Sequence, residues 1–178
     1  MKLLSRILIP FLAGVLLSAG EGGVWLDVPF VKQQTREGCG AAVLSMVLQY
    51  WHAQQPSTAA PPDADQILTA LYSREGKGIY ASQMEQYLKQ QGFRTFATRG
   101  TWADLQPHLE KGRPLIVALQ TRGGDMHYVV VAGVDSQNHL VLKNDPADRK
   151  LLKQARADFE KEWKAADNWL LLAVPDLR

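Results

Sequence analysis

The only cysteine of the chain stands among residues that would leave its thiol usable. Cys39 is preceded by Gly38 and followed by Gly40-Ala41-Ala42, at the start of the segment CGAAVLSMVLQYWH. Because this segment is apolar nearly all round and lacks proline, it predicts a buried central helix over residues 39–52. The sulfur is then expected in an open position at the helix N-terminus, where unpaired N–H groups and the helix dipole favour a thiolate. A cysteine that is merely a small buried hydrophobe is the alternative interpretation.

A thiol nucleophile needs a base, and His127 is the best candidate among the four histidines. It opens the apolar run HYVVVAGV after the Gly123-Gly124 loop, which predicts a position at the mouth of a buried strand. His52 and His108 are expected on or near helix surfaces, and His139 beside a turn. A buried His127 satisfied by a backbone carbonyl is the alternative.

The next predicted strand, VLKNDPA, ends in two side chains that could orient the imidazole, Asn144 and Asp145. Since side chains alternate between the two faces of a strand, only one of them is expected to point at His127. We prefer Asp145, because an ionised carboxylate stabilises an imidazolium and because Pro146 keeps the backbone extended. A simple Asp-Pro turn is the alternative.

Acyl transfer through a thioester also needs hydrogen-bond donors for the developing oxyanion. Gln33 and Gln34 lie six and five residues before Cys39, close enough for a side-chain amide to share that role with the Cys39 backbone N–H. Taken alone, a glutamine pair before a turn is only a polar segment.

The elements that must position these residues are helices first and strands second. Residues 24–33 are β-prone, with Pro29 favouring an edge or a bend. Three helical segments are expected between the central helix and Arg113, one of them opened by a capping box at Ser82-Gln83-Met84-Glu85. The predicted elements after the central helix are helices at 63–72, 82–92 and 101–111, strands at 115–120, 127–134 and 140–143, a helical turn at 158–164 and a strand at 169–174. This order predicts an α+β fold with a mainly antiparallel C-terminal sheet.

Length and charge limit the classes of protein to consider. The 178 residues suit one domain, expected over residues 21–178, after a signal peptide at residues 1–20 with two cations, an apolar stretch and small residues at its end. An uncleaved N-terminal anchor is the alternative. Beyond the signal, acidic and basic residues balance, which argues against a nucleic-acid partner. The sequence shows no His, Cys and acid cluster typical of a zinc site, and we expect no metal or cofactor.

Together, the ordered motifs resemble the C39 peptidase family, which has a papain-like fold. They are Gln33 followed after five residues by Cys39-Gly40-Ala41-Ala42, then His127-Tyr128-Val129-Val130-Val131, then Asp145-Pro146. The resemblance runs from about Val28 to Val174. It implies that Gln33 contributes to the oxyanion hole, Cys39 is the nucleophile, His127 the general base and Asp145 the orienting residue.

The resemblance also implies a peptide or protein substrate. The best-known family members are cytosolic domains of bacteriocin exporters that cut leader peptides after Gly-Gly. This chain lacks a G-x-x-x-x-G-K-[ST] motif and begins with an export signal, so it looks more like the stand-alone exported members, periplasmic or secreted, with no stable membrane insertion once the signal is removed. A cell-wall peptide amidase or transpeptidase, and a non-catalytic peptide-binding module on the same fold, are the competing hypotheses. The sequence does not indicate an oligomeric state.

Overall fold

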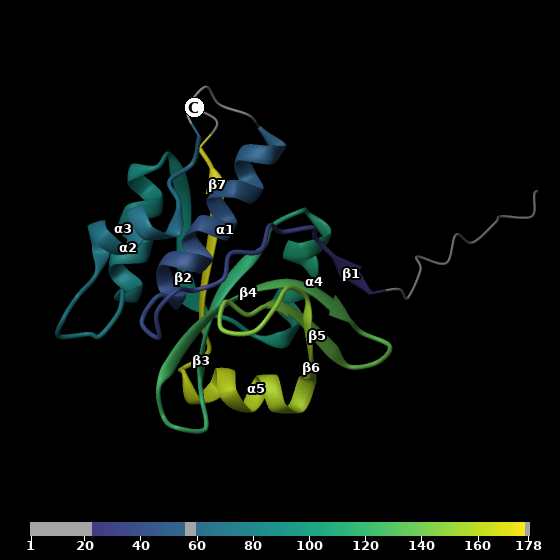
Figure 1. Cartoon of the computed structure of the whole chain (residues 1–178). Coiled ribbons are helices and arrows are strands. Elements are labelled where there is room, and N and C mark those ends of the chain that lie inside the picture. Colours follow the sequence, from purple (N-terminus) through teal and green to yellow (C-terminus); the bar gives the residue numbers. More distant parts are fainter. Residues whose placement is uncertain (1–22, 56–59, 177–178) are drawn as a thin grey trace, which may run out of the picture.

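A computed structural model describes residues 23–55 and 60–176, and it shows an antiparallel sheet with helices on both faces (Figure 1). The predicted signal peptide at residues 1–20 lies outside the described residues. The elements are β1 (Val24–Trp25), α1 (Cys39–Gln54), α2 (Ala64–Leu71), α3 (Ala81–Gln90), β2 (Phe93–Arg99), α4 (Trp102–Glu110), β3 (Leu115–Gln120), β4 (Met126–Asp135), β5 (Leu140–Asn144), β6 (Leu152–Ala155), α5 (Arg156–Ala165) and β7 (Trp169–Pro175).

The sheet places β4 at its centre. Its strand order is β2-β7-β3-β4-β5-β6, with β1 paired to β4, and all these pairings are antiparallel. Along β4, Val130 and Ala132 face one core, while Val129 and Val131 face the other. Because both faces are covered, the strand reads as a continuous apolar run rather than an alternating one. The predicted α+β class is confirmed.

Two separate cores hold the layers together. On one face, α1 is buried along most of its length and packs on β4, which explains its nearly uniform apolar sequence. On the other face, Phe159 and Trp163 of α5 and Leu105 and Leu109 of α4 fill the second core. Figure 1 shows α1 and α5 on opposite sides of the sheet. The sheet therefore carries the central helix, whose first residue is Cys39, on one side only.

The predicted run of helices up to Arg113 is wrong in one respect, because β2 lies between α3 and α4. This strand pairs only with β7 and most of its side chains are exposed, so its sequence FRTFATR carries little apolar periodicity. The strand β6, at the opposite edge of the sheet, is missing from the prediction for the same reason. The position of an edge strand is therefore set by its pairing with the neighbouring strand more than by the apolar pattern of its own residues.

The starts of α1 to α4 lie within one residue of the predicted ones, whereas α5 begins at Arg156, two residues before the predicted start at Asp158. Asp63 and Gln66 cap α2 reciprocally, as their side chains accept from each other's backbone N–H at 2.8 and 3.0 Å. The capping box predicted at Ser82 is wrong, because α3 already begins at Ala81 and the side chain of Gln83 accepts from the Tyr80 N–H at 3.1 Å. Over the described part of the chain, none of the helices has the length and apolar character needed to cross a membrane.

Candidate active site

Cys39 is the first residue of α1, immediately after the N-cap residue Gly38. The expectation of an open position is wrong, since Cys39 is only 9% exposed. The neighbouring glycines permit close packing instead: a Cβ on Gly40 would lie 3.1 Å from the Cβ of Ile79. The nucleophile candidate is therefore at the predicted helix terminus, but other parts of the chain cover it.

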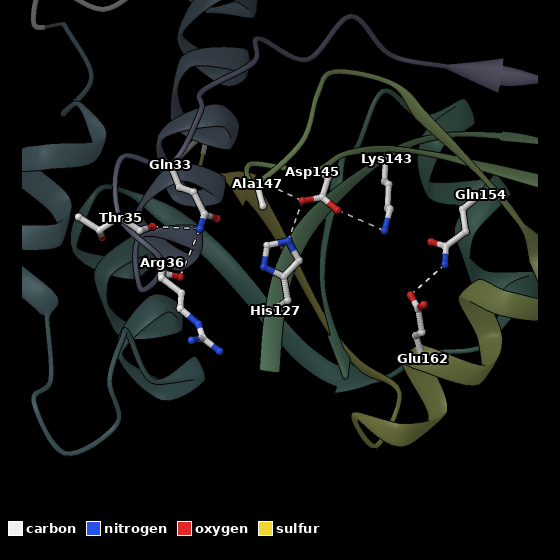
Figure 2. Close-up of polar contacts among 9 residues, drawn as sticks. All are labelled: Gln33, Thr35, Arg36, His127, Lys143, Asp145, Ala147, Gln154 and Glu162. Atoms are coloured by element: carbon white, nitrogen blue, oxygen red, sulfur yellow. Dashed lines mark hydrogen bonds and ion pairs between the residues drawn. The ribbon is translucent and has the colours of Figure 1, made fainter. Parts of the chain in front are cut away.

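His127 lies near the start of β4, and its imidazole is held by Asp145. The distance between His127 Nε2 and Asp145 Oδ1 is 2.7 Å, and both side chains are largely buried. Figure 2 shows the ring below the carboxylate. The Cys39 sulfur lies close enough to the imidazole to influence its protonation. Because Nε2 is engaged with Asp145, Nδ1 is the nitrogen left for the sulfur.

These contacts alter the proton affinity of His127. Burial by itself lowers the pKa of the imidazole, but the hydrogen bond to Asp145 and the negative charges of Asp145 and of the nearby Cys39 sulfur more than offset this and raise it to about 9. A histidine that stays protonated at neutral pH next to a sulfur stabilises the thiolate form of that sulfur.

Asp145 follows directly after β5 and its carboxylate is shared among three partners. Oδ1 accepts from the Ala147 backbone N–H at 3.1 Å as well as contacting His127, and Oδ2 lies 3.4 Å from Lys143 Nζ (Figure 2). Burial raises the pKa of Asp145, but the hydrogen bond to His127 and the charges of His127 and Lys143 bring it below its ordinary value. The carboxylate is therefore ionised across the range in which the imidazole titrates.

Asn144 points away from the imidazole, as side-chain alternation predicts. Fully buried, it donates to the carbonyl of Val28 at 3.0 Å and accepts from the Leu151 N–H at 2.9 Å. It thereby ties the chain before α1 to the loop after β5. The structure brings Asp145, and not Asn144, to His127.

Gln33 lies beside the start of α1, where its Cβ is 3.4 Å from the position a Gly38 Cβ would take. Its backbone N–H donates to the Pro146 carbonyl at 3.0 Å, which fastens it to the loop that carries Asp145. Its side-chain Nε2 donates to the carbonyls of Thr35 at 2.9 Å and Arg36 at 3.2 Å, so both N–H groups of the amide are engaged (Figure 2). Gln34, the other candidate, is exposed.

The loop that carries Gln33 is also linked to the hairpin in front of His127. Arg36 Nη2 and Asp125 Oδ2 are 2.5 Å apart, although both side chains are largely exposed. Asp125 lies in the turn between β3 and β4, two residues before His127. This ion pair joins the segment before the nucleophile to the segment before the base.

The other three histidines lie apart from this group. His52 is near the far end of α1, His108 is on α4, and His139 is exposed, with a φ of 51°, in the turn between β4 and β5. Within residues 23–55 and 60–176, no group of three or more His, Cys, Asp or Glu side chains could hold a metal ion.

Two residues of the site were not found by sequence reasoning. Lys143 is 5% exposed and reaches Asp145. Tyr128 is partly buried and near enough to Cys39 for burial and the negative charge of the sulfur to raise its pKa to about 12. The signal for Lys143 was present in the sequence. Lys143 lies two residues after Val141 and two residues before Asp145 along an extended segment, so side-chain alternation puts all three on the same face.

The Peptidase_C39 like family matches residues 25–169. This chain belongs to that family. The resemblance carried by the ordered Gln, Cys, His and Asp motifs is thus confirmed at the level of the family, and the chain is a C39-like cysteine peptidase in family and fold. No curated protein matches this C39-like chain.

Solved structures share the fold of this C39-like peptidase at low sequence identity. A protein described as a C39-like peptidase from Bacillus anthracis is 20% identical with a TM-score of 0.66, and the match covers 85% of this chain and 97% of that one. The peptidase domain of Streptococcus ComA, a bifunctional ABC transporter involved in quorum sensing, is 23% identical with a TM-score of 0.63, covering 82% and 96%. The peptidase domain of Streptococcus mutans ComA is 22% identical with a TM-score of 0.55, covering 82% and 98%.

Proposed function

We propose that this C39-like peptidase is an exported enzyme that hydrolyses peptide bonds through a thioester on Cys39. The observation that carries the proposal is the position of His127, with a 2.7 Å contact to Asp145 and with the Cys39 sulfur close enough to influence the protonation of the imidazole. A nucleophile, a base and a group that orients the base are thereby brought together in one chain.

Acylation follows from this arrangement. The Cys39 thiolate attacks the carbonyl carbon of the scissile peptide bond, and a tetrahedral intermediate forms with the negative charge on the former carbonyl oxygen. His127, protonated and held by Asp145, donates its proton to the leaving amine as the C–N bond breaks. The acyl group remains on the sulfur as a thioester, and His127 is left neutral.

Deacylation uses the same groups in the reverse sense. Neutral His127 takes a proton from a water molecule that attacks the thioester carbonyl, the C–S bond breaks, and the carboxylic acid product leaves while the thiolate and imidazolium are restored. The oxyanion in both steps is stabilised by the Cys39 backbone N–H and the Gln33 side-chain amide. For Gln33 this requires that one of its two bonds to the loop carbonyls of Thr35 and Arg36 be released.

We further propose that the substrate carries small residues, of the Gly-Gly type, before the scissile bond. The support is the limited access to the reacting groups, since Cys39 is 9% exposed and the His127 side chain 16%. A bulky side chain next to the scissile carbonyl would have to displace the chain that covers the thiol. Gly-Gly is also the site after which the best-known members of the resembled family cut.

The proposal is tested with a peptide-based electrophile that labels active thiols. Mass spectrometry should find one label on the mature protein, at Cys39, and no label on Cys39→Ser. Hydrolysis of a peptide library should favour Gly-Gly over Ala-Ala and Leu-Leu before the cut. Turnover only of cell-wall peptides would instead indicate an amidase or transpeptidase, and binding without turnover would indicate a peptide-binding module.

Export is proposed from Met1–Gly20 and has its own test. N-terminal sequencing of protein from the periplasm or the medium should give a start near Glu21. An intact Met1 in the membrane fraction would show that the segment is an anchor, which would contradict this part of the proposal.

A further inference from the structure

A lysine is buried beside the candidate triad without contacting the imidazole. Lys143 is 5% exposed, on a strand that lies between two others, and its Nζ is 3.4 Å from Asp145 Oδ2. Lysine is almost never fully buried unless its charge is paired, because taking an ammonium out of water is costly. A leucine or methionine would fill this position at lower cost, so the charge itself calls for an explanation.

The two carboxylate oxygens of Asp145 have different partners. Oδ1 contacts His127 at 2.7 Å and accepts from the Ala147 N–H at 3.1 Å, whereas Oδ2 faces Lys143. Figure 2 shows the imidazole and the ammonium approaching the carboxylate from different directions. Without Lys143, the carboxylate of Asp145 would be free to rotate and bring Oδ2 toward the ring. The ion pair of Lys143 with Oδ2 therefore fixes the side-chain orientation in which Oδ1 contacts His127.

We propose that Lys143 is a positioning residue, which fixes Asp145 against His127 and moderates the hold of the carboxylate on the imidazole proton. This inference rests on the proposed function, in which His127 must give its proton to the leaving amine. If the Asp145 carboxylate interacted with His127 alone, the imidazolium would release that proton less readily. The ammonium of Lys143 on the other carboxylate oxygen weakens the attraction between Asp145 and the imidazolium.

The charged and titratable groups around Lys143 come from several elements. Asp145 lies within ion-pair distance of Lys143, and His127 on β4 contacts the other oxygen of that carboxylate. Glu162 on α5 accepts from the side chain of Gln154 on β6 at 2.8 Å (Figure 2). Glu162 is engaged with Gln154, so Asp145 is the carboxylate with which Lys143 forms an ion pair. Removal of the ammonium would consequently be felt first at Asp145 and then at His127 and Cys39.

The direction of the expected change follows from electrostatics. Loss of a buried cation favours the protonated form of every group nearby, whichever group it is. The pH profile of alkylation is expected to have two limbs. In the acid limb the Cys39 thiol loses its proton and the ion pair with His127 forms, and in the alkaline limb the imidazolium loses its proton. Both limbs should move to higher pH by on the order of one pH unit. A role in packing alone would lower stability or the maximal rate and leave both limbs in place.

The experiment measures the rate of iodoacetamide alkylation against pH, together with peptide hydrolysis where a substrate has been found. Since Cys39 is the single cysteine of the chain, the label reports on it alone. Lys143→Met should shift both limbs upward and Lys143→Arg should restore them. Lys153→Met removes the same charge from an exposed position on β6 and should leave the profile unchanged. If Lys143→Met does not fold, Lys143→Gln takes its place.

The outcomes separate this inference from the proposed function. A folded Lys143→Met protein whose limbs coincide with those of the wild type would overturn the role of Lys143. A wild-type protein whose alkylation profile is the same as that of His127→Ala would overturn the proposed function itself. Equal shifts in Lys143→Met and Lys153→Met would show a general charge effect, and would also overturn the specific role of Lys143.

Discussion

The two halves of the candidate site differ in how they are held. The acid–base half, His127 with Asp145 and Lys143, is buried on adjacent strands and each group contacts the next. The oxyanion half, the loop of Gln33 to Arg36, is largely exposed, and its glutamine amide is bonded to carbonyls of its own loop. The acid–base half is therefore arranged before the substrate binds. In the oxyanion half, the Gln33 amide must release a hydrogen bond to its own loop before it can donate to the oxyanion.

This difference reflects where each half lies in the fold. The antiparallel pairing of β4 with β5, which starts at Val130 opposite Asn144, holds side by side the two segments that carry His127 and Asp145, so a displacement of Asp145 would disturb this pairing. The loop is tied by the Gln33 N–H to Pro146 and by the Arg36 and Asp125 ion pair, which leave its side chains freer to rearrange. Substitutions in the two halves should therefore have different consequences.

The largest effect is expected for the base. His127→Ala should abolish turnover, a loss of at least a thousandfold, because His127 gives the proton to the leaving amine and takes the proton from the attacking water in the proposed mechanism. Circular dichroism should show a retained fold. His52→Ala, His108→Ala and His139→Ala are the matched controls and should keep most of the activity; an equal loss in His139→Ala would mean that the active strand has been misassigned.

Asp145 should come next. Asp145→Asn keeps the shape but removes the charge, and Asp145→Ala removes the hydrogen bond as well, so acylation should slow by on the order of ten- to a thousandfold, more for Ala. The unfolding midpoint of Asp145→Asn should change little. Single-turnover acylation and thermal melting measure the two quantities separately.

The adjacent residue provides the control for Asp145. Asn144→Ala leaves the Val28 carbonyl and the Leu151 N–H unpaired in a buried position, and should cost about 1–3 kcal/mol of unfolding free energy with a smaller effect on the rate of the folded protein. A folded Asn144→Ala protein that loses more activity than Asp145→Ala would move the orienting role to Asn144.

Gln33 tests whether the exposed half joins the chemistry. Gln33→Ala should reduce acylation by on the order of a hundredfold if its amide leaves the loop carbonyls and donates to the oxyanion. Gln34→Ala, one residue along, should have little effect because that side chain is exposed. Equal rates for Gln33→Ala and the wild type would show that the amide stays bonded to Thr35 and Arg36.

The raised pKa of His127 predicts a pH dependence of stability. The pKa of about 9 lies above the ordinary value of 6.5, so the contribution of the charged imidazole is fully present below about pH 6.5 and is lost as the pH rises through about 9. The melting temperature of the wild type should accordingly fall more between pH 6.5 and 9 than that of His127→Gln. Parallel curves for the two proteins would show that His127 is not stabilised in its charged form.

The smallest effect is expected at the ion pair that joins the two halves. Arg36→Gln should change the rate of acylation by less than about threefold, because pairs between exposed side chains contribute little and are screened by salt. Asp125→Asn should behave in the same way, and measurement at low and high ionic strength would separate the charge from the side chain. A large loss in both variants would show that the two halves must be tied for catalysis.

Local chemistry allowed much of the fold to be predicted from the sequence. The uniform apolar character of α1, the short helix that follows Asp63, and the β runs around residues 115–144 each depend on neighbouring residues, and the structure has them. The edge strands β2 and β6 were missed, because the side chains of an exposed edge strand show little apolar pattern and the strand is defined by its pairing with the neighbouring strand.

The site divides in the same way. The sequence by itself determined that Cys39 begins a helix and that Asp145 and Asn144 point to opposite faces, since helix termini and strand alternation are local properties. Only the tertiary structure decided that the thiol is covered, that the amide of Gln33 is bonded to its own loop, and that a buried lysine shares the carboxylate. These features depend on residues that are distant in the sequence and meet only when the sheet and the central helix pack together.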